Sequence, residues 1–191
     1  MARAFRRLET REALLIALFA TFLVVARAAM RWHVHIPGHA MIAVAFGLVL
    51  VRSCVDRKTA ATSCGLLAGV VCAALGMGKG GPLVALKLAL PGAAVDLCSA
   101  RGEGGRASIS VPRGLLIGAF AGAIGFAPLV VVEWLANVDP QVIALHALSA
   151  AAGKALFGAA GGAAGAWVAR ELRHHGLIGA APRDAGSEAA A

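Results

Sequence analysis

The sequence predicts an all-α fold: an integral membrane helical bundle of about six transmembrane helices, with both termini in the cytoplasm. Hydrophobic residues make up 59% of the 191 residues and charged residues only 15%, whereas soluble domains carry about 25% charged residues. The apolar residues are gathered in runs, and most lysines and arginines stand at the ends of those runs. These observations favour one compact membrane domain over a soluble fold.

Six apolar segments are expected to form the helices of a transmembrane domain over residues 12–170. A basic cytoplasmic N-terminus, 1–11, precedes them, and the small-residue stretch 171–191 is expected to be a flexible cytoplasmic tail. The second and third segments are shorter than the ~20 residues of a straight span, so five spans with one re-entrant piece is the alternative. The six segments are residues 12–30, 39–52, 60–77, 82–99, 114–135 and 141–169.

The first segment is expected to be a retained helix. It follows MARAFRRLETRE, which resembles the basic start of a signal peptide, but no convincing small-residue cleavage site follows the apolar run. In the fourth segment, the pair Pro91-Gly92 predicts a kink.

The lysines and arginines predict the topology. With six spans, the N-terminus, the 52–59 loop, the 100–113 loop and the tail share one side of the membrane and hold most of the 18 cations. The positive-inside rule places that side in the cytoplasm. A net charge of +8 is also typical of nucleic-acid binding. Here the cations cluster at helix ends rather than on one polar face, so we expect no nucleic-acid partner.

Small residues four positions apart predict close helix packing in four of the segments. In the sixth segment, three glycines share a helix face with Lys154, so the packed face of this helix also carries its lysine. The small residues are Ala13, Ala17, Gly65, Gly69, Gly114, Gly118, Gly122, Gly158, Gly161, Gly162 and Gly165.

Two lysines, Lys87 and Lys154, are expected at membrane depth inside the predicted spans. Lys154 is the only charge between Pro140 and Arg170. A cation near the bilayer centre costs roughly 2.5–3.5 kcal/mol on insertion scales, and such residues often mark a substrate path. We expect Lys154 to form the floor of an outward-facing pocket, with a structural, snorkelling lysine as the alternative. Lys87 and Asp96, in the fourth segment, are expected to be structural.

The densest group of polar side chains is RWHVHIPGH at 31–39, on the predicted outer side. His33, His35 and His39 are candidate ligands of a small molecule or of a transition metal such as Ni²⁺ or Co²⁺. Their spacing matches no strong metal motif. Interfacial histidines beside a belt tryptophan are the alternative.

Other polar side chains are expected at the same outer end. Lys79 lies in the second outer turn, Glu133 and Trp134 end the fifth segment, and His146 lies near the start of the sixth. Together with the histidines and Lys154, they suit a small polar or charged organic ligand. For Glu133 and Trp134, interfacial roles are the alternative.

Enzyme motifs do not appear in the chain. It lacks HExxH, GxSxG and the ATP-binding GxxxxGK[ST] pattern, so we expect a protein that is not an enzyme and binds no cofactor of its own. Its four cysteines form no CxxC pair and are expected to be small core residues.

Three short segments carry a family resemblance: HIPGH at 35–39, GMGKGG at 76–81 and LKLALPGAAVDL at 86–97. With the size and the six-helix pattern, they resemble an uncharacterised subgroup of the substrate-binding S components of energy-coupling factor (ECF) type ABC transporters. The resemblance covers nearly the whole chain. It implies a multi-pass protein of the cell (inner) membrane that binds a vitamin or a transition-metal ion from outside. It also implies partners: a coupling transmembrane protein and a cytoplasmic ATPase pair that uses ATP.

By this resemblance, Ala13 and Ala17 match an AxxxA pattern that docks on the coupling protein. The metal-binding branch typically has a histidine at the extreme N-terminus, and this chain begins MARAF. Uptake of a vitamin-like molecule is the first expectation, because polar groups gather at one end of the predicted bundle. Nickel or cobalt uptake through the same architecture is the second. A structural or assembly membrane protein, in which Lys154 serves packing, is the third. A secondary transporter is disfavoured because no clear internal repeat is seen.

Overall fold

The structure, a computed structural model, is all-helical over the residues it describes, which are 10–30, 38–77, 81, 83–99 and 109–177. This confirms the expected all-α fold class, and no strand occurs in these residues. The described helices are α1 (Thr10–Met30), α2 (Met41–Cys54), α3 (Ala60–Ala74), α4 (Leu83–Ser99), α5 (Val111–Ile124), α6 (Ala127–Leu135) and α7 (Pro140–His174).

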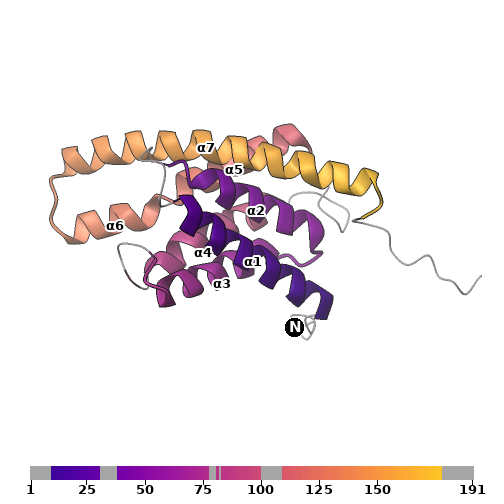
Figure 1. The fold of residues 1–191 in the computed structure, drawn as a ribbon. Helices are drawn as coiled ribbons and strands as arrows, with labels where there is room; N and C mark the ends of the chain where they lie inside the picture. Colours follow the sequence, from indigo (N-terminus) through magenta and orange to yellow (C-terminus); the bar gives the residue numbers. More distant parts are fainter. Residues whose placement is uncertain (1–9, 31–37, 78–80, 82, 100–108, 178–191) are drawn as a thin grey trace, which may run out of the picture.

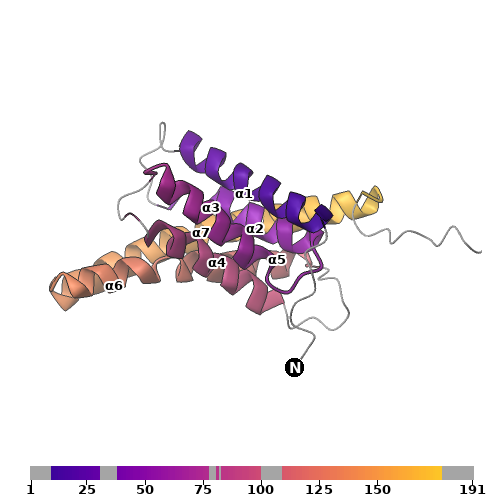
Figure 2. The ribbon, with the colours of Figure 1, turned by 90° about the horizontal axis from the view of Figure 1, so that it is seen from below.

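The helices form an elongated bundle in which α7 is the longest element (Figures 1 and 2). α5 and α2 pack along α7, α3 packs along α4, and α1 lies against α2 and α3. Leu23, Leu48, Val49 and Val95 are fully buried in the apolar core between them. α6 and the first half of α7 extend beyond the other helices (Figure 1). We call this extension, residues 127–152, the α6–α7 arm.

The fifth apolar segment, expected as one helix, is split in two. α5 ends at Ile124, and α6 begins at Ala127. Gly125 is the C-cap of α5, and Pro128 stands in the first turn of α6, where a missing N–H leaves no hydrogen bond unmade. At the other end of the chain, α7 continues to His174, so that the first four residues of the expected tail, 171–174, are helical.

Three helical stretches are long and apolar enough to cross a membrane: Thr10–Met30, Val111–Trp134 and Pro140–His174. They mark the chain as a membrane protein. α2 and α3, with 14 and 15 residues, are apolar but only about 21–23 Å long, as their short sequences predicted. The 35 residues of α7 span about 52 Å, well beyond a hydrocarbon core of ~30 Å. The count of six crossings remains a prediction.

The glycines of α5 and α7 let the two helices pack backbone to backbone. A Cβ built on Gly118 would clash with the carbonyl oxygen of Gly158. Gly161 packs in the same way against the backbone of Ile42 in α2. α7 therefore uses one small-residue face for α5 and another for α2, which agrees with the close packing that the spacing predicted.

The packing also fixes the helix directions. Along α7, contacts with α5 run in reverse order and contacts with α2 run in the same order. α2 is antiparallel to α1, because Gly47 packs on Leu23 while Met41 and Arg27 line one cavity. The start of α1 and the end of α7 therefore lie at one end of the bundle, the terminal end (Figure 1). The other end, the far end, holds the end of α1 and the starts of α2 and α4.

A buried ion pair closes the terminal end. Asp96 in α4 and Arg52 in α2 are 6% and 5% exposed, and Arg52 Nε lies 3.5 Å from Asp96 Oδ1. The carboxylate also accepts hydrogen bonds from the backbone N–H groups of Ala61 (3.2 Å) and Thr62 (2.7 Å) and from the Thr62 hydroxyl (2.6 Å). Asp96 thus caps the first turn of α3 from a neighbouring helix, a structural role such as the sequence favoured.

Candidate functional site

A small cavity lies at the far end of the bundle, between α1, α2, α4, α5 and α7. Its volume is about 160 Å³. Three cations from three different helices line it, and the remaining lining residues are apolar or glycine. The cavity-lining residues are Arg27, Gly38, Ala40, Met41, Val44, Lys87, Leu88, Gly125 and Lys154.

Lys154 reaches from α7 to the end of α5. Its Nζ donates to the carbonyl oxygen of Gly125 at 3.4 Å and lies 5.1 Å from the centre of the Phe126 ring. A helix C-terminus and an aromatic face both attract a cation without neutralising its charge. Among the described residues, no carboxylate forms an ion pair with this amine.

Lys154 lies at one end of the bundle, beside the end of α5 and the start of α2. The residue is near the middle of α7, yet it lies beside the last turn of α5, where Gly122 packs on its backbone. The reason is the length of α7, whose first half belongs to the α6–α7 arm (Figure 1). The cavity therefore lies at one end of the bundle rather than at its centre.

The turn before α2 packs directly on Lys154. Gly38 has φ +91°, and a Cβ at this position would lie 3.0 Å from the backbone of Gly153 and of Lys154. Glycine adopts this positive φ readily and leaves room for the backbone of α7. A residue with a side chain would be strained at this φ and would crowd that backbone. The next residue, His39, donates from Nε2 to the carbonyl oxygen of Met30 at 3.2 Å. This hydrogen bond connects the turn before α2 to the end of α1, at the far end of the bundle.

Three of the expected site residues, His33, His35 and Lys79, lie outside the described residues. Of the three histidines considered as metal ligands, the structure therefore describes His39 alone. Its imidazole is hydrogen-bonded to the backbone, and it does not line the cavity.

The other expected ligand residues lie on the α6–α7 arm. Glu133 Oε1 is 3.9 Å from Nδ1 of His146, so the two side chains meet as their common outer position suggested. Trp134 is 68% exposed. None of these three lines the cavity, because His146 precedes Lys154 by eight residues, about 12 Å along the helix axis.

The sequence pattern did not single out Arg27 and Lys87 as site residues. Each is half-buried and lines the cavity with Lys154. A signal was present: both are cations inside apolar runs, at the outer end of their segments. Their convergence depends on how α1, α4 and α7 pack, which helical periodicity alone does not specify.

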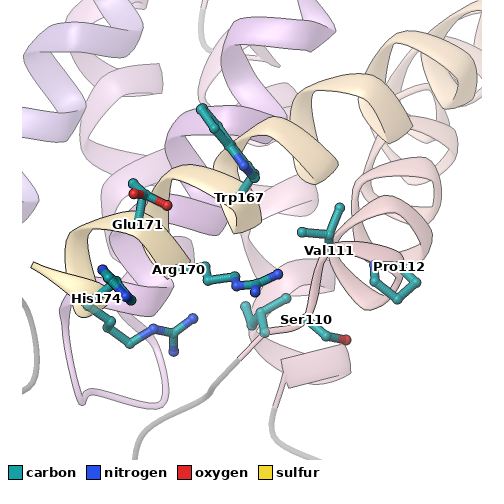
Figure 3. A pocket seen from close by; sticks show the side chains of 9 residues that line it. Ser110, Val111, Pro112, Trp167, Arg170, Glu171 and His174 are labelled. Carbon is teal, nitrogen blue, oxygen red and sulfur yellow. The ribbon is translucent and has the colours of Figure 1, made fainter.

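A larger, open hollow of about 880 Å³ lies at the terminal end, between the start of α5 and the end of α7 (Figure 3). Arg170 of α7 extends toward Ser110, the N-cap residue of α5, and His174 also lines the hollow. Trp167, on its rim, is 57% exposed. An exposed tryptophan beside arginines is typical of a membrane–water interface.

One group of three potential metal ligands lies close together within the described residues, and it also lies at the terminal end. The ligand atoms of Glu171, His174 and His175 lie within 4.8 Å of one another, and all three residues are exposed. Glu171 Oε1 is 3.3 Å from His175 Nε2, an ordinary i, i+4 pair on a helix surface. This group is distant from the cation-lined cavity.

α1 turns its AxxxA pattern outward. Ala13 and Ala17 are both exposed, beside Leu14 and Leu18 at 66% and 64% exposure. The small-residue stripe is therefore accessible on this apolar helix face.

No match to this chain is found among protein-family models, curated proteins or solved structures. The function proposed below rests on the residues, their geometry and the sequence resemblance described above.

Proposed function

We propose that this chain is the membrane-embedded substrate-binding subunit of an ECF-type uptake transporter and captures a small vitamin-like molecule from the outer face of the cell membrane. The observation that carries the proposal is the cavity at the far end, where Arg27, Lys87 and Lys154 converge. Seven lysines and arginines of the described residues lie at the terminal end, at the start of α1 or α5, at the end of α2 or α7, or in the turn between α2 and α3: Arg11, Arg52, Arg57, Lys58, Arg113, Arg170 and Arg173. By the positive-inside rule that end is cytoplasmic, and the cavity then faces outward.

An organic ligand fits this cavity better than a metal ion does. Three cations repel a divalent metal, whereas polar groups in an otherwise apolar cavity are typical anchors of an organic molecule. A purely structural Lys154 accounts for the contact with Gly125. It does not account for two further cations beside the same cavity.

Uptake in this proposal needs partners. The chain has no ATP-binding motif, so a coupling transmembrane protein and a cytoplasmic ATPase pair would supply the driving force. The exposed Ala13 and Ala17 would let a partner helix approach α1 closely. The large apolar side chains exposed on the other helices, such as Leu116 and Leu156, suit lipid contact.

Co-purification and uptake test the proposal together. The chain is co-expressed with a coupling protein and its ATPase pair, and vitamin uptake into cells is followed. Ala13→Leu with Ala17→Leu should abolish complex formation and uptake while the purified subunit stays folded. Leu14→Ala, on the same exposed surface, should leave both intact. Failure of the unaltered chain to associate with any coupling protein contradicts the proposal.

A further inference from the structure

We infer that the cavity binds an anionic group, so that the ligand carries a carboxylate or a phosphate at the end that enters first. The inference deepens the proposed function, on which it rests for the identity of the cavity as the ligand site. Its basis is the charge balance of the cavity lining and its size.

The cavity has an unbalanced positive charge. Arg27, Lys87 and Lys154 line it, and the described lining includes no acidic side chain. The partners of Lys154, the Gly125 carbonyl and the Phe126 ring, are neutral. In a medium of low dielectric constant, like charges repel strongly. An anion bound among them removes this repulsion and gains charge-assisted hydrogen bonds.

The buried cation at the terminal end has a counter-ion within the chain. At the terminal end, Arg52 has the carboxylate of Asp96 at 3.5 Å. On the α6–α7 arm, Glu133 is engaged by His146. The sequence segments 31–37 and 78–82, which follow α1 and precede α4, contain Arg31 and Lys79 and no acid. The missing counter-ion of the cavity is therefore assigned to the ligand.

The size of the cavity fits a head group rather than a whole vitamin. Its volume of about 160 Å³ is below the range of about 300–1,000 Å³ for pockets of drug-sized ligands. Met41, Val44 and Leu88 supply apolar walls. A carboxylate or phosphate with its adjoining carbons fits this volume, and the remainder of the ligand would extend outward.

Matched acid and neutral probes test the inference. Thermal unfolding of the purified chain in detergent is followed with nicotinate and nicotinamide, with pantothenate and panthenol, and with pyridoxal phosphate and pyridoxal. Acetate and inorganic phosphate serve as minimal anions. The anionic member of at least one pair should stabilise the protein more than its neutral counterpart does. Stabilisation by the carboxylate-bearing probes would identify a carboxylate as the anionic group, and stabilisation by the phosphate-bearing probes would identify a phosphate.

Variants locate the effect. Lys154→Met and Lys87→Gln should each weaken binding of the stabilising anion about tenfold or more, the loss expected for one charge-assisted hydrogen bond. Lys154→Arg should retain most of the binding and shows that the site still folds. Lys58→Gln removes an exposed lysine of the turn between α2 and α3 and should bind as the unaltered chain does.

The inference is overturned if neutral and anionic members stabilise equally, if no anionic probe stabilises, or if Lys154→Met and Lys87→Gln bind like Lys58→Gln. These outcomes are separable from a failure of the proposed function. A chain that binds anions through Lys154 but associates with no coupling protein upholds the inference and contradicts the transport role. A chain that supports uptake of neutral molecules only upholds the transport role and contradicts the inference of an anionic ligand.

Discussion

The amine of Lys154 lies 3.4 Å from the carbonyl oxygen of Gly125, and this contact joins the long helix α7 to the point where α5 ends. The negative end of the α5 dipole attracts the lysine. The same position brings the amine to a cavity lined by Arg27 and Lys87. One side chain therefore has both a structural contact and a place in the candidate site, and substitutions can separate the two.

Lys154→Met should leave the fold stable and weaken binding of the stabilising anion about tenfold or more. Loss of one long hydrogen bond to a carbonyl costs about 1 kcal/mol, and removal of a half-buried cation offsets part of it. The melting temperature and the ligand affinity of the same purified variant are to be compared. A variant that binds normally would support a purely structural lysine.

Asp96→Asn should destabilise the protein without changing the far end. It leaves the guanidinium of Arg52, 5% exposed, without its counter-ion, at a cost of about 3 kcal/mol. Asp139→Asn is the control, since Asp139 is the N-cap of α7 and asparagine caps equally well. Equal unfolding midpoints for the two variants would show that the ion pair contributes little. Under conditions in which it is still folded, the Asp96→Asn variant should bind the ligand with the same affinity as the unaltered chain.

Gly118→Ala should disrupt the contact of α5 with α7. Its Cβ would overlap the Gly158 carbonyl oxygen, and overpacking of this kind costs about 1–3 kcal/mol. Ala123→Leu, at an exposed position of α5, should change the free energy of unfolding by less than about 0.5 kcal/mol. Denaturation of the two purified variants gives the comparison. Similar stabilities would argue against close packing at Gly118.

His146→Ala and Trp134→Ala should affect ligand affinity less than Lys154→Met does. Both side chains are on the α6–α7 arm, and neither lines the cavity. His146 lies about 12 Å from Lys154 along α7. Calorimetric titration of each variant with the stabilising anion measures the difference. A tenfold or greater loss in either variant would place the arm within the ligand site.

The proposed topology predicts opposite labelling of two single-cysteine variants. In a chain whose native cysteines are replaced by alanine, Lys58→Cys should react with a membrane-impermeant thiol reagent only after the cells are permeabilised. Ala136→Cys, exposed at the end of α6, should react in intact cells. Labelling of both from the same side would contradict the proposed orientation.

The helical segments were largely predictable because apolar runs and the charges that bound them are local signals. The break at Gly125 was not, since residues 111–134 form one apolar stretch in which a glycine and Pro128 are weak stop signals. The glycine spacing predicted that α5 and α7 have packing faces. It did not say that Gly158 faces α5 while Gly161 faces α2.

The candidate site was predictable only in part. Lys154 stood out because it is one charge in a long apolar helix. Its level within the bundle was not predictable, because the arm makes α7 much longer than the bundle. Arg27 and Lys87 come from helices far apart in the chain, and their meeting with Lys154 depends on tertiary packing. The pair Arg52–Asp96 was missed for the same reason, as its members are 44 positions apart.

Mass spectrometry of the small molecules retained on the purified chain tests the central claim most directly. The unaltered protein and Lys154→Met are purified in parallel, and their bound molecules are released and compared. The account predicts that the unaltered chain retains a carboxylate- or phosphate-bearing molecule that is absent from Lys154→Met. A neutral retained molecule, or the same molecule retained equally by both proteins, would contradict it.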